Sequence, residues 1–382
     1  MAAKRVIILG STGSIGRATI EVARGLGEAV TVVGLAAGAN WRLLAGQAGE
    51  LRPKSIAICE ESSFDELRRA VGGQTRVFAG AAGLIDLIAE TETDFVVSAI
   101  VGAAGLPPTL AAVERGIDVG LANKESLVVA GAILMPLAKK TGSNLIPVDS
   151  EHSAVFQAMH AGRRDEVKTI YLTASGGPFR TWPKEKIAAA TVEQALKHPN
   201  WVMGPKITID SATMMNKALE IIEAHHLFDA PPEMIEVLVH PESIVHSMVE
   251  YHDGSVLAQL GVPDMKTPIQ YALTYPLRAP GASAPLDWRQ VRTLNFEPPD
   301  MERFPALRLG FEAARAGGSL GAVLNAANEA AVAKFRAGTI RFGEIAELTE
   351  ATMQRHRRID TPTLEQLLEA DAWARHEVME CR

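Results

Sequence analysis

Three acidic residues have the type and spacing expected of a site for a divalent cation. Asp149 and Glu151 directly follow an apolar run at 144–148, and Glu220 lies in a helical pattern further along the chain. In an extended segment, residues i and i+2 project to the same side, so Asp149 and Glu151 can reach one ion. Mg²⁺ and Mn²⁺ bind oxygen ligands and keep coordination positions for substrate oxygens. The alternative is that the polar residues after this run only cap a helix.

The pattern around Glu220 adds polar side chains of other types. Asn216, Lys217 and Glu220 are spaced so that they share one face of a helix. If Glu220 binds the cation, Asn216 and Lys217 are placed to contact an anionic substrate; the alternative is a solvated Lys–Glu pair. The pattern predicts that this helix spans 211–228 and that a strand precedes it at 206–209.

A glycine-rich segment near the N-terminus has the context of a dinucleotide site. Residues 10–16 read Gly-Ser-Thr-Gly-Ser-Ile-Gly, directly after an apolar run at 5–9 and at the start of a helical pattern at 15–24. Glycines in such a loop let the backbone approach a pyrophosphate, and the helix N-terminus attracts its charge. An ordinary strand–helix turn is the alternative, but the order of strand, loop and helix favours a nicotinamide dinucleotide.

The residues after the second predicted strand bear on which dinucleotide binds. NAD-specific sites usually carry an Asp or Glu about 20 residues after the glycine loop. This segment instead reads Gly38-Ala39-Asn40 and contains no acid. The missing carboxylate leaves room for a 2′-phosphate, and Arg42 is nearby. The sequence therefore predicts NADPH as the cofactor.

Two later loops and one lysine have the composition of a substrate site. Residues 175–180 (Ser-Gly-Gly-Pro-Phe-Arg) offer N–H groups and a hydroxyl to a phosphate or phosphonate, although such turns are also common without a ligand. Residues 198–204 (His-Pro-Asn-Trp-Val-Met-Gly) indicate either a lid over the site or a loop packed on the core. Lys124 follows a strand that ends at Ala122, where α/β proteins bind substrates, but it could equally belong to a surface helix cap.

The elements that carry these residues predict an α/β fold in three parts. Residues 1–149 alternate apolar runs with helical patterns, which indicates an N-terminal Rossmann-like parallel sheet that binds NADPH. Residues 150–276 predict a central α/β catalytic domain that binds metal and substrate. The Pro-rich segment 277–304 predicts a linker, and residues 305–382 a C-terminal helical bundle. Strands are predicted in the first part at 5–9, 30–35, 55–58, 95–99, 118–121 and 144–148, and helices in the last at 305–316, 319–336, 341–357 and 362–378.

Composition excludes some classes of partner. The 382 residues carry a formal net charge of -7, which disfavours nucleic-acid binding because that depends on clustered Lys and Arg. Cys59 and Cys381 are isolated, as expected in a reducing compartment. No apolar run approaches the roughly 18 residues of a membrane span. We therefore expect a cytoplasmic protein with no nucleic-acid or membrane partner.

Taken together and in this order, the motifs resemble those of the 1-deoxy-D-xylulose 5-phosphate reductoisomerase family of the non-mevalonate isoprenoid precursor pathway. Each motif alone is modest, but the ordered set is specific and covers essentially the whole chain. The matching segments are residues 10–16, 121–127, 147–152, 175–180, 198–204 and 210–220, with further similarity at 240–246 and 325–329.

The resemblance implies an NADP-dependent oxidoreductase that isomerises and reduces 1-deoxy-D-xylulose 5-phosphate to 2-C-methyl-D-erythritol 4-phosphate. It implies NADPH contacts from Thr12, Gly13, Ser14, Ile15, Gly38, Asn40, Asn123, Glu125 and Gly204. It implies that Asp149, Glu151 and Glu220 bind one divalent cation, either Mg²⁺, Mn²⁺ or Co²⁺. The implied substrate contacts are Lys124, Ser150, Glu151, Ser175, His198, Trp201, Met203, Ser211, Asn216, Lys217 and Glu220, of which Lys124, Glu151 and His198 are the expected catalytic residues.

Further expectations come from the same resemblance. Trp201 and Met203 would lie on a closing flap, and the protein would be a homodimer inhibited by phosphonate hydroxamates such as fosmidomycin. One residue departs from the family pattern, because Ala39 stands between Gly38 and Asn40 where the family often has Lys. This departure removes one expected contact to the adenosine phosphate, which Arg42 would compensate.

Two other functions are compatible with parts of the pattern. A metal-assisted hydroxyacid dehydrogenase would share the glycine loop and the carboxylates but would not rearrange a carbon skeleton, so the identity of the product separates it from a reductoisomerase. A redox-sensing regulator that binds a dinucleotide without turnover would carry a degraded carboxylate set and a DNA-binding element. All three carboxylates are present and no basic helix is seen, which disfavours the regulator.

Overall fold

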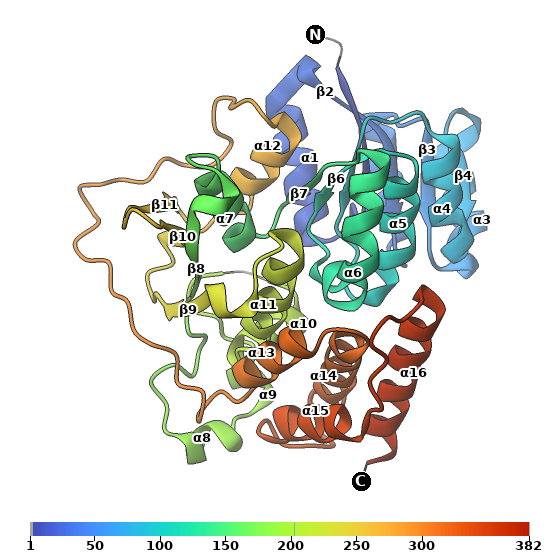
Figure 1. The fold of residues 1–382 in the computed structure, drawn as a ribbon. Coiled ribbons are helices and arrows are strands. Elements are labelled where there is room, and N and C mark those ends of the chain that lie inside the picture. The colour runs from blue at the N-terminus through green and yellow to red at the C-terminus, as the bar shows by residue number, and fades with distance from the viewer. Residues whose placement is uncertain (1–2, 202, 382) are drawn as a thin grey trace. The chain divides into compact units, whose positions relative to one another are not determined.

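Short runs of Val, Ile and Leu alternate with helices in the first part of the chain. In the computed structural model, which describes residues 3–201 and 203–381, these runs form a seven-stranded sheet in which all paired strands are parallel (Figure 1). The strand order is β4-β3-β2-β1-β5-β6-β7. The strands are β1 (Lys4–Leu9), β2 (Val30–Ala37), β3 (Ser55–Ile58), β4 (Arg76–Ala79), β5 (Phe95–Ser98), β6 (Asp118–Leu121) and β7 (Leu145–Pro147).

The chain forms two compact units, and each takes segments from distant parts of the sequence. Unit 1 comprises residues 3–126, 134–153 and 264–285, and unit 2 comprises residues 127–133, 154–263 and 286–381. Unit 1 therefore includes 264–276, which the sequence analysis grouped with the central part of the chain. Lys266 of this segment pairs with Glu21 at 3.3 Å, which fastens it to the first helix of the unit.

Helices connect the strands of unit 1, as expected when parallel strands need crossover connections. The predicted N-terminal Rossmann-like sheet is confirmed, although β4 was not predicted. The helices are α1 (Ser14–Leu26), α2 (Trp41–Leu51), α3 (Phe64–Val71), α4 (Gly80–Glu90), α5 (Leu106–Glu114), α6 (Lys124–Thr141) and α12 (Lys266–Thr274). The middle of α6, residues 127–133, belongs to unit 2.

Unit 2 combines a small mixed sheet with a group of helices. The sheet has the order β11-β10-β8-β9, in which β10 is antiparallel to both neighbours and β8 is parallel to β9. Its strands are β8 (Val167–Ala174), β9 (Ile235–Val239), β10 (Val245–Tyr251) and β11 (Val256–Leu260). Helix α7 (Ser150–Met159) begins in unit 1 and continues into unit 2.

The helices of unit 2 share one apolar core with its sheet. Ile170 on β8, Leu219 on α11, Leu307 on α13 and Val323 on α14 are buried in the same cluster. The C-terminal helical region was predicted correctly, because its helices begin and end within a few residues of the expected bounds. The helices are α8 (Lys184–Ala188), α9 (Val192–Ala195), α10 (Pro205–Ala212), α11 (Met215–Leu227), α13 (Ala306–Ala316), α14 (Leu320–Arg336), α15 (Glu344–Arg355) and α16 (Leu364–Glu380).

Two local predictions within residues 206–228 were wrong. The strand expected at 206–209 is part of α10, which starts where Pro205 occupies the first turn after Gly204. The single helix expected at 211–228 is two helices, because Met214 adopts a left-handed conformation with φ 61° and ends the run. A helical apolar pattern continues through this break, so periodicity did not reveal it.

The Pro-rich segment 277–304 connects the two units without regular structure of its own. Among its described residues, Glu297 forms an isolated bridge with Val239, and no helix or longer strand is present. Across the described residues as a whole, no helix combines the length and the apolar character needed to cross a lipid bilayer.

Candidate active site

The carboxyl ends of the parallel strands in unit 1 lie along one edge of the sheet, and the predicted residues follow them. The chain passes from β1 outward through β2, β3 and β4, and then returns to place β5 on the other side of β1. Ligands of open α/β sheets bind outside the carboxyl ends of the strands at such a reversal. The glycine loop follows β1, residues 38–40 follow β2, Lys124 follows β6 and Asp149 follows β7.

The glycine loop has the close backbone packing that a pyrophosphate site requires. Gly10 has φ 84°, and a Cβ placed on it would lie 2.5 Å from the carbonyl oxygen of Ala99. The N–H of Gly13 donates to Gly10 O at 3.0 Å, which closes the turn before α1. Among the described residues no side chain caps α1 at Gly13. The first-turn N–H groups are therefore available to an anion.

The loop after β2 leaves its polar residues at the surface. Asn40 caps α2 by accepting from Leu43 N at 3.2 Å. Gly38 and Ala39 are exposed. The guanidinium of Arg42 stacks over the ring of Trp41 at 4.5 Å. The exposed positive charge of Arg42 thus lies in the segment where the resemblance implies the adenosine phosphate.

Asn123 connects two loops at the edge of the sheet. Its side-chain oxygen accepts from Ser126 N at 3.0 Å and so caps α6. Its amide nitrogen donates to Ile100 O at 2.6 Å, Gly102 O at 2.9 Å and Glu125 Oε2 at 3.0 Å. Both hydrogens and the oxygen are thus used within the protein. The side chain of Asn123 therefore fixes the loop after β5 and orients Glu125, and any cofactor contact of Asn123 is left to its backbone.

A buried ion pair lies next to these residues. Lys124 Nζ is 2.5 Å from Asp149 Oδ2, and the two side chains are 6% and 14% exposed. Ser150 Oγ donates to Glu151 Oε2 at 2.5 Å. We expected Asp149 and Glu151 in an extended segment; this was wrong, because α7 begins at Ser150 and Glu151 lies in its first turn. The ammonium of Lys124 and the carboxylates of Asp149 and Glu151 nevertheless all lie at one edge of the sheet of unit 1.

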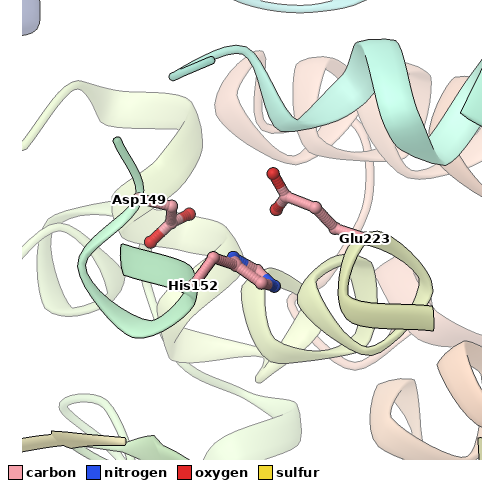
Figure 2. Close-up of side chains that lie close together, drawn as sticks. All are labelled: Asp149, His152 and Glu223. Atoms are coloured by element: carbon pink, nitrogen blue, oxygen red, sulfur yellow. The ribbon is translucent and has the colours of Figure 1, made fainter. Parts of the chain in front are cut away.

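Two buried titratable residues were not assigned a role from sequence. His152 follows Asp149 by three positions, and Figure 2 shows both side chains on the segment that begins α7. Glu223, which is labelled in the same figure, lies on α11 three positions after Glu220. Both residues are almost fully buried. His152 was within a segment that resembles the family, which was the only sequence signal for it.

In unit 2, the loop after β8 approaches the end of α10. Gly176 and Gly177 have φ values of 81° and 68°, a conformation that glycine adopts without strain. A Cβ on Gly177 would lie 2.6 Å from the carbonyl oxygen of Ser211. Only glycine permits this approach, which brings the backbone of the 175–177 turn against Ser211.

The hydrogen bonds of His198 indicate its tautomer at this loop. Its Nδ1 accepts from Asn200 N at 3.1 Å and Trp201 N at 2.9 Å, so Nδ1 carries no proton. A neutral ring then has its proton on Nε2, which lies 3.1 Å from Ser175 Oγ and donates to it. Gly177 N also donates to Ser175 Oγ at 3.2 Å. Two donors are directed at the oxygen of Ser175. Its hydroxyl is therefore oriented to donate a hydrogen bond to an anion.

The break between α10 and α11 positions a second polar group. After Met214, Asn216 Nδ2 and Lys217 Nζ both donate to the carboxylate of Glu220. The side chains of Lys217 and Glu220 are 3% and 0% exposed. The oxygen of Asn216 is buried and has no hydrogen-bond partner among the described residues. The carboxylate of Glu220 thus lies against the ammonium of Lys217 and the amide of Asn216.

The loop that follows His198 is tied to a neighbouring loop and borders a cavity. Asn200 Nδ2 donates to Pro241 O at 2.7 Å and Ser243 Oγ at 2.9 Å. The ring centroid of Trp201 is 6.3 Å from that of His246. Val202 lies outside the described residues, and Gly204 precedes α10. A cavity of 360 Å³ is lined by Ser175, Gly177, Pro178, Phe179, Arg180, Thr181, Trp182, Gln194, Lys197, Pro199 and Pro241.

Comparison with known proteins places the chain in one family. Family models match residues 6–131 (1-deoxy-D-xylulose 5-phosphate reductoisomerase), residues 145–228 (its C-terminal domain) and residues 260–377 (DXP reductoisomerase C-terminal domain). The reductoisomerase of Chlorobaculum tepidum is 53% identical over 373 residues, which cover 97% of this chain and 98% of that protein. The chain belongs to the 1-deoxy-D-xylulose 5-phosphate reductoisomerase family.

Other members of the reductoisomerase family agree over the same length. The protein of Geotalea uraniireducens is 51% identical over 378 residues, which cover 99% of this chain and 98% of its own. The Zymomonas mobilis enzyme, solved in complex with NADPH, has a TM-score of 0.92 at 44% identity, with 99% of this chain and 98% of that chain covered. A DOX-P reductoisomerase solved with NADPH, fosmidomycin and magnesium has a TM-score of 0.94 at 41% identity, with coverage of 98% and 97%.

Each unit contains a different part of the residue set that the resemblance to reductoisomerases implied. Unit 2 holds Ser175, His198, Trp201, Met203, Gly204, Ser211, Asn216, Lys217 and Glu220. Unit 1 holds Thr12, Gly13, Ser14, Ile15, Gly38, Asn40, Asn123, Lys124, Glu125, Asp149, Ser150 and Glu151.

Proposed function

We propose that this chain converts 1-deoxy-D-xylulose 5-phosphate into 2-C-methyl-D-erythritol 4-phosphate, using NADPH and one divalent cation. The observation that carries this proposal is its full-length match to reductoisomerases at 50–53% identity over at least 96% of the chain. This is a step in the supply of isoprenoid precursors by the non-mevalonate route. We also propose that the protein acts in the cytoplasm as a homodimer.

We propose that NADPH binds along the carboxyl edge of the parallel sheet. The N–H groups that begin α1 would hold its pyrophosphate, with contacts from Thr12 to Ile15. Gly38, Asn40, Glu125 and Gly204 are further proposed contacts, together with the backbone of Asn123. The chain has Ala39 beside the expected adenosine phosphate, and the exposed Arg42 is the charge that we propose for that group.

We propose Asp149, Glu151 and Glu220 as ligands of the cation. All three supply carboxylate oxygens, the donors that Mg²⁺ and Mn²⁺ prefer. Each is held by a neighbour: Asp149 by Lys124, Glu151 by Ser150, and Glu220 by Asn216 and Lys217. Related reductoisomerases have been solved with magnesium, which supports the same cation here.

We propose that unit 2 binds the substrate phosphate. Ser175, Ser211, Asn216 and Lys217 provide two hydroxyls, an amide and an ammonium, and Gly177 lets the first of them approach the second. His198 orients the Ser175 hydroxyl toward the anion. A phosphonate would fit the same groups, so we expect inhibition by fosmidomycin, the compound bound in related structures.

The chemistry follows from these assignments. When bound, the cation polarises the adjacent oxygens of the substrate, and NADPH supplies the hydride that reduces the rearranged aldehyde. Lys124 is proposed to stabilise negative charge on a substrate oxygen, and Glu151 to carry protons to and from that group. We propose that the carbon skeleton rearranges by retro-aldol cleavage and re-addition. Trp201 and Met203 would cover the substrate and keep water from the intermediate.

Functional boundaries are proposed to follow the sequence rather than the two compact units. Residues 1–149 would bind NADPH, 150–276 would bind metal and substrate, 277–304 would link the parts, and 305–382 would support the catalytic part.

The test is NADPH oxidation followed by absorbance, with 1-deoxy-D-xylulose 5-phosphate and Mn²⁺, repeated after addition of EDTA. We expect oxidation that depends on the metal and a product identified by mass spectrometry and NMR as 2-C-methyl-D-erythritol 4-phosphate. NADPH oxidation without skeletal rearrangement would favour the hydroxyacid dehydrogenase. No oxidation by folded protein with several divalent metals would refute the proposal.

A further inference from the structure

The buried carboxylate of Asp210, next to the proposed phosphate site, is hydrogen-bonded to the C-terminal helical region. Asp210 lies on α10 directly before Ser211, and its side chain is 1% exposed. Its Oδ2 pairs with Lys206 Nζ at 2.8 Å, and its Oδ1 accepts from Asn328 Nδ2 of α14 at 2.9 Å. Both oxygens of this carboxylate are therefore engaged, one of them by a residue 118 positions later in the chain.

Asp210 has hydrogen bonds through both its side chain and its backbone. Asn328 is fully buried on α14, and its amide nitrogen must face Asp210 because a carboxylate only accepts hydrogen bonds. The backbone oxygen of Asp210 accepts from Thr213 Oγ1 at 3.2 Å, and Thr213 Oγ1 in turn accepts from Met215 N at 3.2 Å. Asp210 is thus hydrogen-bonded through its side chain to α14, and its backbone oxygen is linked through Thr213 to Met215, the first residue of α11.

Such an arrangement is not explained by stability alone. Taking a carboxylate out of water is unfavourable, and a buried ion pair is often replaced by apolar residues without loss of stability. The hydrogen bonds of Asp210 instead set the geometry of the junction between α10 and α11. Ser211 precedes the break at Met214, and Lys217 follows it. The separation between Ser211 and Lys217 depends on how this junction is held.

We infer that Asp210 and Asn328 are positioning residues for substrate binding, through which α14 holds Ser211 and the junction before Lys217 in the geometry that binds the phosphate. The inference rests on the proposed function, since it assumes that these groups bind the substrate phosphate. It assigns a role to Asn328, for which the reaction itself gives none.

The experiment compares Asn328→Asp with Asn325→Asp. Asn325 is a matched control, because it is fully buried on the same helix but donates to Glu329, at 3.2 Å, instead of Asp210. Both variants place a carboxylate beside a carboxylate, and urea unfolding of each measures the stability that it loses. We expect N328D to raise the KM for 1-deoxy-D-xylulose 5-phosphate about tenfold, the effect of losing a hydrogen bond to a charged group. The KM for NADPH should change less than twofold, and N325D should leave both KM values within twofold.

A double variant tests the contact itself. In Asp210→Asn with Asn328→Asp, the amide at 210 can donate to the new carboxylate and accept from Lys206, so we expect part of the lost affinity to return. If N328D is not folded, Asn328→Ser removes the amide without adding charge and should raise the same KM.

The two hypotheses fail in different ways. A wild-type protein that does not turn over the sugar phosphate refutes the proposed function. A wild-type protein that turns it over, while N328D (or N328S) leaves its KM within twofold or changes it no more than N325D does, overturns this inference. Equal increases in the KM values for NADPH and the sugar phosphate also overturn it.

Discussion

Replacing Glu220 with Gln tests the metal site most directly. The substitution keeps the shape of the side chain but removes the charge that faces Lys217. Both side chains are almost fully buried, so the substitution breaks this ion pair inside the protein. Breaking a buried pair in this way costs about 3–5 kcal/mol of stability. The loss of one carboxylate ligand should also lower kcat about a hundredfold or more, since a bound cation contributes several kcal/mol to transition-state stabilisation.

Two assays separate these effects. Urea unfolding in EDTA measures stability without metal, and we expect Glu220→Gln combined with Lys217→Met to regain most of the stability that the single change loses. Mn²⁺ binding by titration calorimetry measures the ligand role. Lys217→Met alone keeps all three carboxylates, so we expect it to bind Mn²⁺ while its KM for the sugar phosphate rises.

If Glu220→Gln binds Mn²⁺ as tightly as the wild-type protein, Glu220 is not a ligand of the metal. NADPH affinity should be unchanged in all three variants, since none of them alters the glycine loop. A change in NADPH affinity as large as the change in Mn²⁺ affinity would indicate a general disturbance of the fold.

Four further predictions follow from single residues. Lys124→Met should lower kcat by about 10²–10³ without weakening Mn²⁺ binding, measured by turnover and calorimetry; unchanged kcat would remove Lys124 from the chemistry. Gly177→Ala, with φ 68° and a Cβ 2.6 Å from Ser211 O, should raise the KM for the sugar phosphate about tenfold or more in the same assay. Ala39→Lys should lower the KM for NADPH by up to about fivefold, because the added charge is exposed; no change would argue that this position does not face the cofactor. Burial, and secondarily His225, lowers the pKa of His226 to about 4. Unfolding by urea should therefore show stability that is present above pH about 6.5 and falls by about 3 kcal/mol as the pH decreases through about 4, with a flatter profile in His226→Gln.

Contiguous motifs were readable from the sequence because one short segment contains all their determinants. The glycine loop needs a strand before it, a helix after it and glycines at the turn, and all of these lie within 4–26. The strand β7 and the acidic residues after it were found in the same way. Even there the local conformation was missed, since α7 starts at Ser150 and Glu151 is helical.

Features that depend on packing could not be predicted from the sequence. Met214 has φ 61° although its residue type does not favour that conformation, and its side chain is buried. The alternating polar and apolar residues at 206–209 form too short a run to distinguish a strand from a helix. In the structure they lie in α10. The bond from Asn328 to Asp210 joins segments 118 residues apart, and neither residue alone has a distinctive spacing.

The residues proposed for the sugar phosphate and for NADPH lie mostly in different units, so substitutions at them should affect different affinities. All the residues that we propose for the phosphate lie in unit 2, and those for NADPH, apart from Gly204, lie in unit 1. Within unit 2, His198 and Gly177 orient Ser175, and within unit 1, Asn123 orients Glu125. A substitution that disturbs one of these local networks should therefore alter the affinity for one ligand and spare the other. Only turnover, which needs hydride from NADPH and the bound sugar phosphate at once, should respond to changes in both, so kcat is the wrong quantity for assigning a residue to either part.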